Sequence, residues 1–161
     1  METDVRVGYG YDAHRLKSGR RCVLCGVEIP CEFGPDGHSD ADVALHALMD
    51  ALLGALALGD IGKHFPDADD KWLMADSMEL LKNVYAMVRG LGYRLGNADI
   101  TIVLQTPRLS PYIDTMRAKV AQAVEADIGR VSVKATTEEG MGFTGDGSGI
   151  SSTAAVLLFR D

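Results

Sequence analysis

Two residues near the start of the chain, Asp12 and His14, have the types and the spacing of metal ligands. They lie in the stretch GYGYDAHRL, where alternating glycines precede them and a strand is predicted. Because side chains along a strand alternate between its faces, Asp12 and His14 project to the same side. A carboxylate and an imidazole placed in this way supply two of the three protein ligands of a catalytic zinc site.

The segment HSDADVALH supplies candidates for the third ligand. His46 falls on a predicted helix, whereas His38 falls in the loop before it. Asp12, His14 and His46 would complete the ligand count of a catalytic zinc site and leave His38 for a substrate. The alternative is structural: a hydrogen-bonded surface pair on the strand and a helix histidine satisfied by local contacts.

Carboxylates flank His46 on the predicted helix. Asp42 and Asp50 lie one helical turn before and after it, so they share its face. Either could orient the imidazole through a hydrogen bond. The alternative is a pair of solvated helix charges, which suits Asp42 better because Asp50 lies between leucine-rich turns. His64 has no partner at metal-binding spacing, and we expect it to be exposed.

Two polar stretches could contact a phosphorylated sugar. KATTEEGMGF offers hydroxyls, backbone N–H groups and the pair Glu138 and Glu139, which suits Mg²⁺ or Mn²⁺ beside phosphates. GDIGKHFPDADD, residues 59–70, offers carboxylates to sugar hydroxyls, although both stretches also fit ordinary turns. The glycine-rich residues 140–149 match no established phosphate-binding pattern and could simply connect two strands.

The elements that must position these residues form one α+β domain over residues 1–161. Strands are predicted over 5–11, 22–29, 98–105, 131–136 and 151–159, and helices over 42–58, 77–90 and 111–126. Ser39 or Asp40 could cap the first helix, Ser77 opens the second, and Ser110 with Pro111 opens the third. We expect a mixed sheet with helices mainly on one face.

Charge and composition exclude several classes of protein. The net charge of −7 argues against a nucleic-acid partner. No apolar run reaches the roughly 18 residues that suggest a membrane span, and no secretory signal is visible, so we expect a cytoplasmic protein. The odd number of cysteines, Cys22, Cys25 and Cys31, predicts free thiols. The alternative for Cys22 and Cys25 is a structural zinc or redox site.

Taken together, the motifs resemble one enzyme family. GYGYDAHRL, HSDADVALHALMDALLGALALGDIGKHFPD, LGNADITIVLQTP and VKATTEEGMGFTGDGSGI occur in the order found in 2-C-methyl-D-erythritol 2,4-cyclodiphosphate synthases, over nearly the whole chain. The resemblance implies an enzyme of non-mevalonate isoprenoid biosynthesis that converts 4-diphosphocytidyl-2-C-methyl-D-erythritol 2-phosphate to the cyclic diphosphate and CMP. It also implies a homotrimer with active sites between subunits, each holding Zn²⁺ and either Mg²⁺ or Mn²⁺.

The resemblance assigns roles to individual positions. Asp12, His14 and His46 match the zinc ligands, and Glu139 matches the ligand of the second metal. His38 and Thr137 match the groups that stabilise the transition state. The remaining positions that match substrate contacts are Ser39; Asp60, Ile61 and Gly62 at the ribose; Phe65, Pro66, Asp67, Ala68 and Asp69 at the methylerythritol; Leu104, Gln105, Thr106, Pro107, Arg108, Leu109 and Ser110 at the cytosine; Thr136 and Glu138 at the phosphates; and Phe143 and Asp146 at the trimer channel.

The sequence departs from the family pattern in two places. Asp146 and Ser148 stand where many relatives have arginine and glutamate beside the trimer's central channel, and Asp146 would repel an isoprenoid diphosphate there. Phe143 keeps the channel apolar. Glu138 stands where a third threonine is common. Since neighbouring strand residues face opposite ways, we expect Glu139 to be the metal ligand.

Two other functions fit the same metal-binding residues. The first is a metal-dependent phosphohydrolase that uses zinc-bound water, but such an enzyme would not need the cytidine pocket LQTPRLS. The second is a non-catalytic module that binds a metal and a nucleotide. An assay of products separates all three functions.

Overall fold

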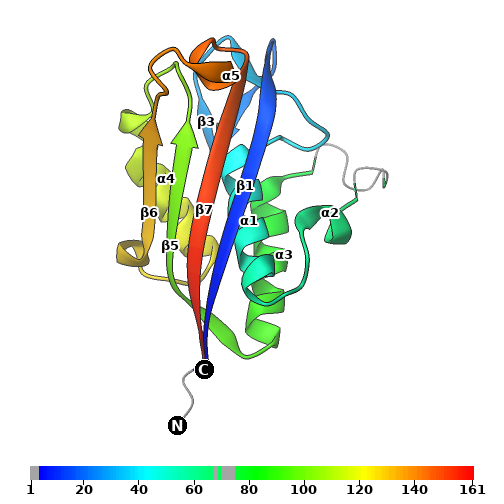
Figure 1. Ribbon diagram of the computed structural model, residues 1–161. Coiled ribbons are helices and arrows are strands. Elements are labelled where there is room, and N and C mark those ends of the chain that lie inside the picture. Colours follow the sequence, from blue (N-terminus) through cyan, green and yellow to red (C-terminus); the bar gives the residue numbers. More distant parts are fainter. Residues whose placement is uncertain (1–3, 67–68, 70–74) are drawn as a thin grey trace.

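A mixed five-stranded sheet forms the centre of the molecule, in the strand order β4–β1–β7–β5–β6 (Figure 1). The computed structural model describes residues 4–66, 69 and 75–161. The strands of the sheet are β1 (Val5–Ser18), β4 (Phe33–Pro35), β5 (Tyr93–Val103), β6 (Val131–Thr136) and β7 (Gly149–Arg160). β1 pairs antiparallel with β4 and β7, β7 pairs antiparallel with β5, and β5 pairs parallel with β6.

The longer helices pack behind one face of this sheet in the view of Figure 1. They are α1 (Val43–Ala55), α3 (Ser77–Gly90) and α4 (Ile113–Ala123); the shorter elements are α2 (Ile61–His64), α5 (Gly142–Gly145), the 3₁₀ turns Ser110–Tyr112 and Ile128–Arg130, and the hairpin of β2 (Cys22–Leu24) with β3 (Val27–Ile29). The prediction of an α+β domain with helices mainly on one face is confirmed. No helix in the described part of the chain is long and apolar enough to cross a membrane.

Helix α1 lies against β1 unusually closely, and two glycines make this possible. A Cβ atom at Gly8 would lie 1.8 Å from the carbonyl oxygen of Ala51, and one at Gly10 would lie 1.9 Å from that of Ala47. Any side chain at either position would therefore separate the helix from the strand. The helix is buried along nearly its whole surface, which explains why its sequence is apolar on all sides. The alternating glycines thus bring α1 onto the strand that carries Asp12 and His14.

The other face of β1 is apolar and exposed. Val7 is 73% exposed, Tyr9 66% and Tyr11 52%, and all three alternate with the residues that face α1. The strand therefore has a face of glycines and polar ligands under the helix and a face of large apolar side chains toward solvent.

Several predicted boundaries were wrong for local reasons. The predicted strand over 22–29 is a hairpin, because Cys25 and Gly26 take positive φ values of 49° and 73° and turn the chain. β1 and β5 are longer than predicted, since β7 pairs with them from Val5 to Arg15 and from Tyr93 to Val103. The short strand β4 and the helices α2 and α5 were not predicted.

The predicted helix starts also needed correction. Asp42, rather than Ser39 or Asp40, caps α1, where its carboxylate accepts the Leu45 N–H. Asp76 caps α3, and Ser77 is the first residue inside that helix. Residues 110–112 form a 3₁₀ turn, so α4 begins only at residue 113.

Candidate metal and nucleotide site

Asp12, His14 and His46 converge on one point between β1 and α1. Each offers one ligand atom, and these atoms all lie within 4.8 Å of one another. Asp12 Oδ2 lies 2.9 Å from His14 Nε2 and 3.0 Å from His46 Nδ1. The pairing predicted from strand alternation is confirmed, and the close packing of α1 on β1 adds the third residue.

A second contact holds the His14 ring in place. Its Nδ1 lies 3.0 Å from the carbonyl oxygen of Asp36, which can only accept, so Nδ1 carries a proton and Nε2 faces Asp12. Burial opposes the charged form of His14, but the hydrogen bond with Asp12 raises its pKa. Burial likewise opposes ionisation of Asp12, yet hydrogen bonds from His14 and His46 lower the pKa of Asp12 to about 2. Asp12 is therefore a carboxylate.

The donor set of this cluster fits a zinc ion. Two imidazole nitrogens and one carboxylate oxygen are the ligand types that zinc prefers, and three protein ligands are typical of a catalytic site. Both rings point a nitrogen at the same carboxylate oxygen, so a cation placed there would meet one oxygen and two nitrogen lone pairs once the intervening protons leave. The exposed far side of the cluster opens into a pocket, which leaves room for a further ligand.

This metal pocket has a volume of about 380 Å³. Besides the three cluster residues, it is lined by His38, Ser39, Ile61, Gly62 and Phe65, all of which were predicted as site residues. Of the other predicted residues nearby, Asp60 caps α2 by accepting the Lys63 N–H at 2.9 Å. Pro66 is exposed, and its carbonyl accepts the Asp69 N–H at 3.0 Å. Asp67 and Ala68 lie outside the described residues.

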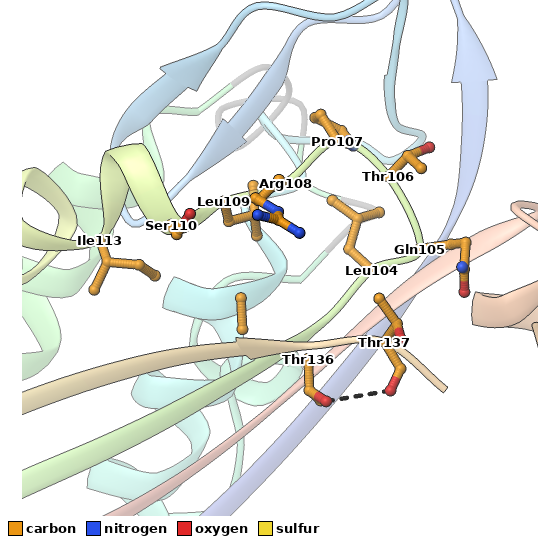
Figure 2. A pocket seen from close by; sticks show the side chains of 11 residues that line it. Leu104, Gln105, Thr106, Pro107, Arg108, Leu109, Ser110, Ile113, Thr136 and Thr137 are labelled. Carbon is orange, nitrogen blue, oxygen red and sulfur yellow. Dashed lines mark hydrogen bonds between the residues drawn. The ribbon is translucent and has the colours of Figure 1, made fainter. Parts of the chain in front are cut away.

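A second pocket, of about 580 Å³, opens beyond the end of β5 (Figure 2). Every residue from Leu104 to Ser110 lines it, as do Thr136 and Thr137 at the end of β6. The structure thus brings together two segments that the resemblance assigned separately, to the cytosine and to the phosphate side. Its volume lies within the range of small-molecule sites, and Arg108 is the one ionisable side chain among its described lining residues. We call it the nucleotide pocket, because the family resemblance assigns the segment Leu104–Ser110 to a cytosine.

The sheet places both pockets near the same end of the molecule. Asp12 pairs with Ser152, Ser152 with Ile102 and Ile102 with Ala135, so the four residues form one row across the sheet. Asp12 lies in the metal pocket and Ala135 in the nucleotide pocket. Three strand spacings separate them, about 14 Å.

The adjacent residues Glu138 and Glu139 differ in their surroundings. β6 ends at Thr136, so strand alternation, the reason given above for preferring Glu139, does not apply. The Glu138 carboxylate accepts a hydrogen bond from Thr144 Oγ1 at 2.8 Å. Glu139 has a φ of 54°, and its carboxylate is exposed while its backbone N–H donates to Thr137 Oγ1 at 3.2 Å. Both residues are exposed, so the hydrogen bond from Thr144, which engages Glu138, is what distinguishes the two carboxylates.

Phe143 and Asp146 line neither pocket, like Asp60, Pro66, Asp69, Glu138 and Glu139. Phe143 lies on α5 and is 46% exposed. Asp146 follows α5 and is exposed; hydrogen bonding by the side chain of Ser148 and by its backbone N–H, at 2.8 Å, lowers the pKa of Asp146.

The carboxylates of Asp42 and Asp50 do not hydrogen-bond to the His46 imidazole, and Asp42 is buried, so both readings of Asp42 were wrong. The Asp42 carboxylate is fully buried and accepts the N–H groups of Cys25, Gly26 and Leu45 at 2.8–3.1 Å. It fixes the start of α1 to the β2–β3 turn. Asp50 accepts the Ile61 N–H at 2.8 Å and so ties the turn before α2 to α1.

The remaining histidine and the cysteines have structural surroundings. His64 is half-buried, with Nε2 2.9 Å from the Leu58 carbonyl oxygen, so the prediction of an exposed side chain was wrong. All three cysteines are free thiols, as predicted. Burial raises the pKa of Cys22 to about 12 and holds that of Cys25 well above its usual value, so neither thiol is reactive near neutral pH.

Sequence reasoning missed the groups that hold the histidine rings, among them Asp36 and Ser77. Ser77 Oγ lies 3.0 Å from His46 Nε2, although the two residues are 31 positions apart. Its sequence context predicted only a helix start, and no spacing rule connects α3 to the metal ligands. The contact follows from the packing of α3 beside α1.

Comparisons with known proteins agree with this geometry. A curated 2-C-methyl-D-erythritol 2,4-cyclodiphosphate synthase from Trichlorobacter lovleyi is 57% identical, over 96% of this chain and 98% of its own length. The bifunctional IspDF from Campylobacter jejuni superposes with a TM-score of 0.95 at 41% identity, covering 99% of this chain and 43% of that one. A CDP complex of IspF from Plasmodium falciparum superposes with a TM-score of 0.87 at 29% identity, over 100% of this chain and 99% of that one. The model of the YgbB family matches residues 5–159, and the chain belongs to that family.

Proposed function

We propose that the chain converts 4-diphosphocytidyl-2-C-methyl-D-erythritol 2-phosphate to 2-C-methyl-D-erythritol 2,4-cyclodiphosphate and CMP. The observation that carries this proposal is the placement of a three-ligand metal cluster and a nucleotide-sized pocket on one row of the sheet. The named function of the curated relatives and the CDP complex of the Plasmodium protein support it. The cytidine group of this substrate would occupy a nucleotide pocket, and its phosphates would reach a metal cluster.

Asp12, His14 and His46 hold the zinc ion in this account, through Oδ2, Nε2 and Nδ1 respectively. When bound, zinc acts as a Lewis acid that polarises an oxygen of the β-phosphate. Asp36, Ser39 and Ser77 hold the two imidazole rings at their other nitrogens. The rings therefore do not need to reorganise when the substrate arrives.

Glu139 is the protein ligand of the second metal, Mg²⁺ or Mn²⁺, in the same account. One carboxylate suffices for such an ion, because substrate phosphates and water complete its coordination. The exposed position of Glu139 beside the nucleotide pocket fits this role, whereas Glu138 is occupied by Thr144. When bound, this metal neutralises charge on the diphosphate as CMP leaves.

The reaction itself is an intramolecular phosphoryl transfer. An oxygen of the 2-phosphate attacks the β-phosphorus, and a new P–O bond forms. The bond from that phosphorus to the bridging oxygen breaks, and CMP leaves with the electron pair. The nucleophile is already an anion, so no general base is required. His38 and Thr137 donate hydrogen bonds where charge develops, and positioning supplies much of the remaining rate.

Substrate recognition is divided between the pockets. The segment Leu104–Ser110 reads the edge of the cytosine with backbone groups, and Thr136 and Glu138 lie on the phosphate side. The turn Asp60–Gly62 holds the ribose, and the segment 65–69 contacts the methylerythritol. Ser39 and His38 line the metal pocket between these parts.

The exposed apolar face of β1 supports assembly as a homotrimer with active sites between subunits. Val7, Tyr9 and Tyr11 are all more than half exposed, and Met141 is 66% exposed near Phe143. Large apolar side chains exposed along one face of a strand are typical of an interface. Asp146 would then lie near the trimer axis, where its negative charge disfavours binding of an isoprenoid diphosphate.

The experiment that tests the proposed function is a product assay. The purified protein, loaded with zinc and Mg²⁺, is incubated with 4-diphosphocytidyl-2-C-methyl-D-erythritol 2-phosphate, and the products are followed by ³¹P NMR. Equal amounts of CMP and a cyclic diphosphate support the proposal. Linear monophosphates would show a phosphohydrolase, and nucleotide binding without turnover would show a binding module; either result would contradict it.

A further inference from the structure

His46 is held on the side away from Asp12 by a hydroxyl from another helix. Ser77, the first residue of α3, is fully buried and places Oγ 3.0 Å from His46 Nε2. His46 is 9% exposed, so water does not compete freely for this nitrogen. The contact joins the start of α3 to the first turn of α1.

The proton of this hydroxyl is already committed. Ser77 Oγ donates to Asp40 Oδ1, and the Ser77 N–H donates to Asp40 Oδ2 at 3.0 Å. Asp40 also accepts the Asp42 N–H at 3.1 Å. Asp40 is the acceptor in all three of these hydrogen bonds. The Ser77 hydroxyl therefore uses its single proton in the hydrogen bond to Asp40.

The direction of the contact with His46 follows from this commitment. Having donated to Asp40, Ser77 Oγ can only accept from His46, so the imidazole carries a proton on Nε2. Nδ1, which faces Asp12 Oδ2 at 3.0 Å, is then the nitrogen that offers a lone pair to a metal ion. The arrangement selects the ring form of His46 that binds metal through Nδ1.

Ser39 lies near the same nitrogen but imposes no such choice. Its Oγ is 3.2 Å from His46 Nε2 and accepts the Ala41 N–H at 3.0 Å. That acceptance leaves the Ser39 hydroxyl proton free, so Ser39 can donate or accept. Because Ser77 can only accept from His46 whereas Ser39 can do either, Ser77 and Asp40 determine which ring nitrogen of His46 carries the proton.

We propose that Ser77 and Asp40 are a positioning pair that fixes the orientation and the proton of His46 and thereby sets the affinity of the Asp12–His14–His46 cluster for zinc. The inference rests on the zinc site of the proposed function but not on cyclisation. Since Ser77 is the first residue of α3, the pair also makes zinc affinity depend on the placement of that helix end.

The test measures zinc affinity in the absence of any substrate, by competition with a chromophoric chelator. Ser77→Ala should bind zinc roughly 10–100-fold more weakly, the usual cost of losing a partner that orients a ligand. Ser77→Thr keeps the hydroxyl and should recover most of the affinity. Asp76→Ala is the matched control, because Asp76 caps the same helix through the Met78 N–H but does not touch His46. It should lower the thermal midpoint and leave zinc affinity unchanged.

A spectroscopic measurement separates positioning from a loss of packing. In the zinc-loaded protein, ¹H–¹⁵N spectra should show a slowly exchanging proton on His46 Nε2, and Ser77→Ala should make that proton exchange rapidly. If Ser77→Ala does not fold, Asp40→Asn replaces it, and we expect weaker zinc binding there too because the hydroxyl proton is released. Parental zinc affinity in Ser77→Ala, or in Asp40→Asn when it stands in, would overturn the inference. That result would leave the proposed cyclase reaction standing, because the titration contains no substrate and measures zinc binding alone.

Discussion

The metal pocket and the nucleotide pocket lie at the same end of one sheet but are built in opposite ways. In the metal pocket, side chains from β1 and α1 meet, and each imidazole has its second nitrogen bound by another group. The nucleotide pocket is formed by the irregular segment Leu104–Ser110 and the end of β6, with one ionisable side chain among its described lining residues. The metal pocket therefore presents titratable side chains held in fixed positions, whereas the nucleotide pocket presents mainly apolar and uncharged polar groups. Substitutions should therefore separate the two functions.

The largest effect is expected for His46→Ala, which removes a proposed zinc ligand. Turnover should fall by more than the roughly 100-fold that the loss of an orienting partner costs, because the ligand itself is lost. Zinc content by elemental analysis should fall with it. CMP binding, measured by calorimetry, should be retained because the nucleotide pocket shares no lining residue with the metal pocket. Full turnover in this variant would remove zinc from the account.

Thr137→Val tests the nucleotide pocket, because it removes a hydroxyl that lines this pocket and keeps nearly the same side-chain shape. We expect turnover to fall about 100-fold through loss of a donor to developing charge, while zinc affinity stays unchanged. Thr136→Val is the matched control, since the Thr136 hydroxyl donates to the Thr137 carbonyl oxygen at 3.2 Å. Steady-state rates and chelator titrations check both variants. Equal losses in the two variants would mean that Thr137 has no special role.

The two glutamates beside the nucleotide pocket provide a smaller and sharper contrast. Glu139→Gln should raise the half-saturating concentration of Mg²⁺ about tenfold, as expected for one lost contact to a charged group. Glu138→Gln should change it little, because its carboxylate accepts from Thr144 and an amide oxygen can replace it. Initial rates across a Mg²⁺ titration measure both. The reverse ranking would assign the second metal to Glu138.

The smallest effect on catalysis is expected at Asp42, which fixes the start of the helix that carries His46. Burial raises the pKa of Asp42 from 3.8 to about 7. The backbone N–H groups of Gly26, Leu45 and Cys25 favour the anion and offset part of this effect. The folded protein therefore binds this proton more tightly than the unfolded chain does. The contribution of Asp42 to stability is greatest below pH 3.8 and falls as the pH rises to about 7, by up to about 4 kcal/mol.

Asp42→Asn cannot ionise, so it should lack this fall. Urea unfolding of the parent and the variant between pH 4 and 8 measures the difference in unfolding free energy, and that difference should shift in favour of the variant as the pH rises. Turnover by the zinc-loaded Asp42→Asn variant should change little if α1 stays in place. A difference that is constant across this range would show that Asp42 remains ionised throughout.

Sequence reasoning reached the metal pocket only in part. Strand alternation predicted that Asp12 and His14 would share a face, but it could not link them to His46, 32 residues beyond His14 on another element. That link depends on Gly8 and Gly10, whose missing side chains allow α1 to approach β1. The glycines and the helix were each visible in the sequence, whereas the packing of the helix against the glycines was not.

The nucleotide pocket shows a different limit. Residue patterns could not have joined Leu104–Ser110 to Thr136, because the two segments meet through the parallel pairing of β5 with β6. The family resemblance identified both segments, and the sheet register explains why they meet. Contacts made by single hydroxyls and carbonyls, such as Ser77 and Asp36 on the two histidines, carry no periodic signal and emerge only from the packed structure.

The most direct test of the central claim is anomalous scattering from a crystal of the zinc-loaded protein, collected on both sides of the zinc absorption edge. The account predicts one strong peak per chain, about 2.0–2.2 Å from Asp12 Oδ2, His14 Nε2 and His46 Nδ1. Zinc located instead at the cysteines, or no peak between β1 and α1, would contradict it.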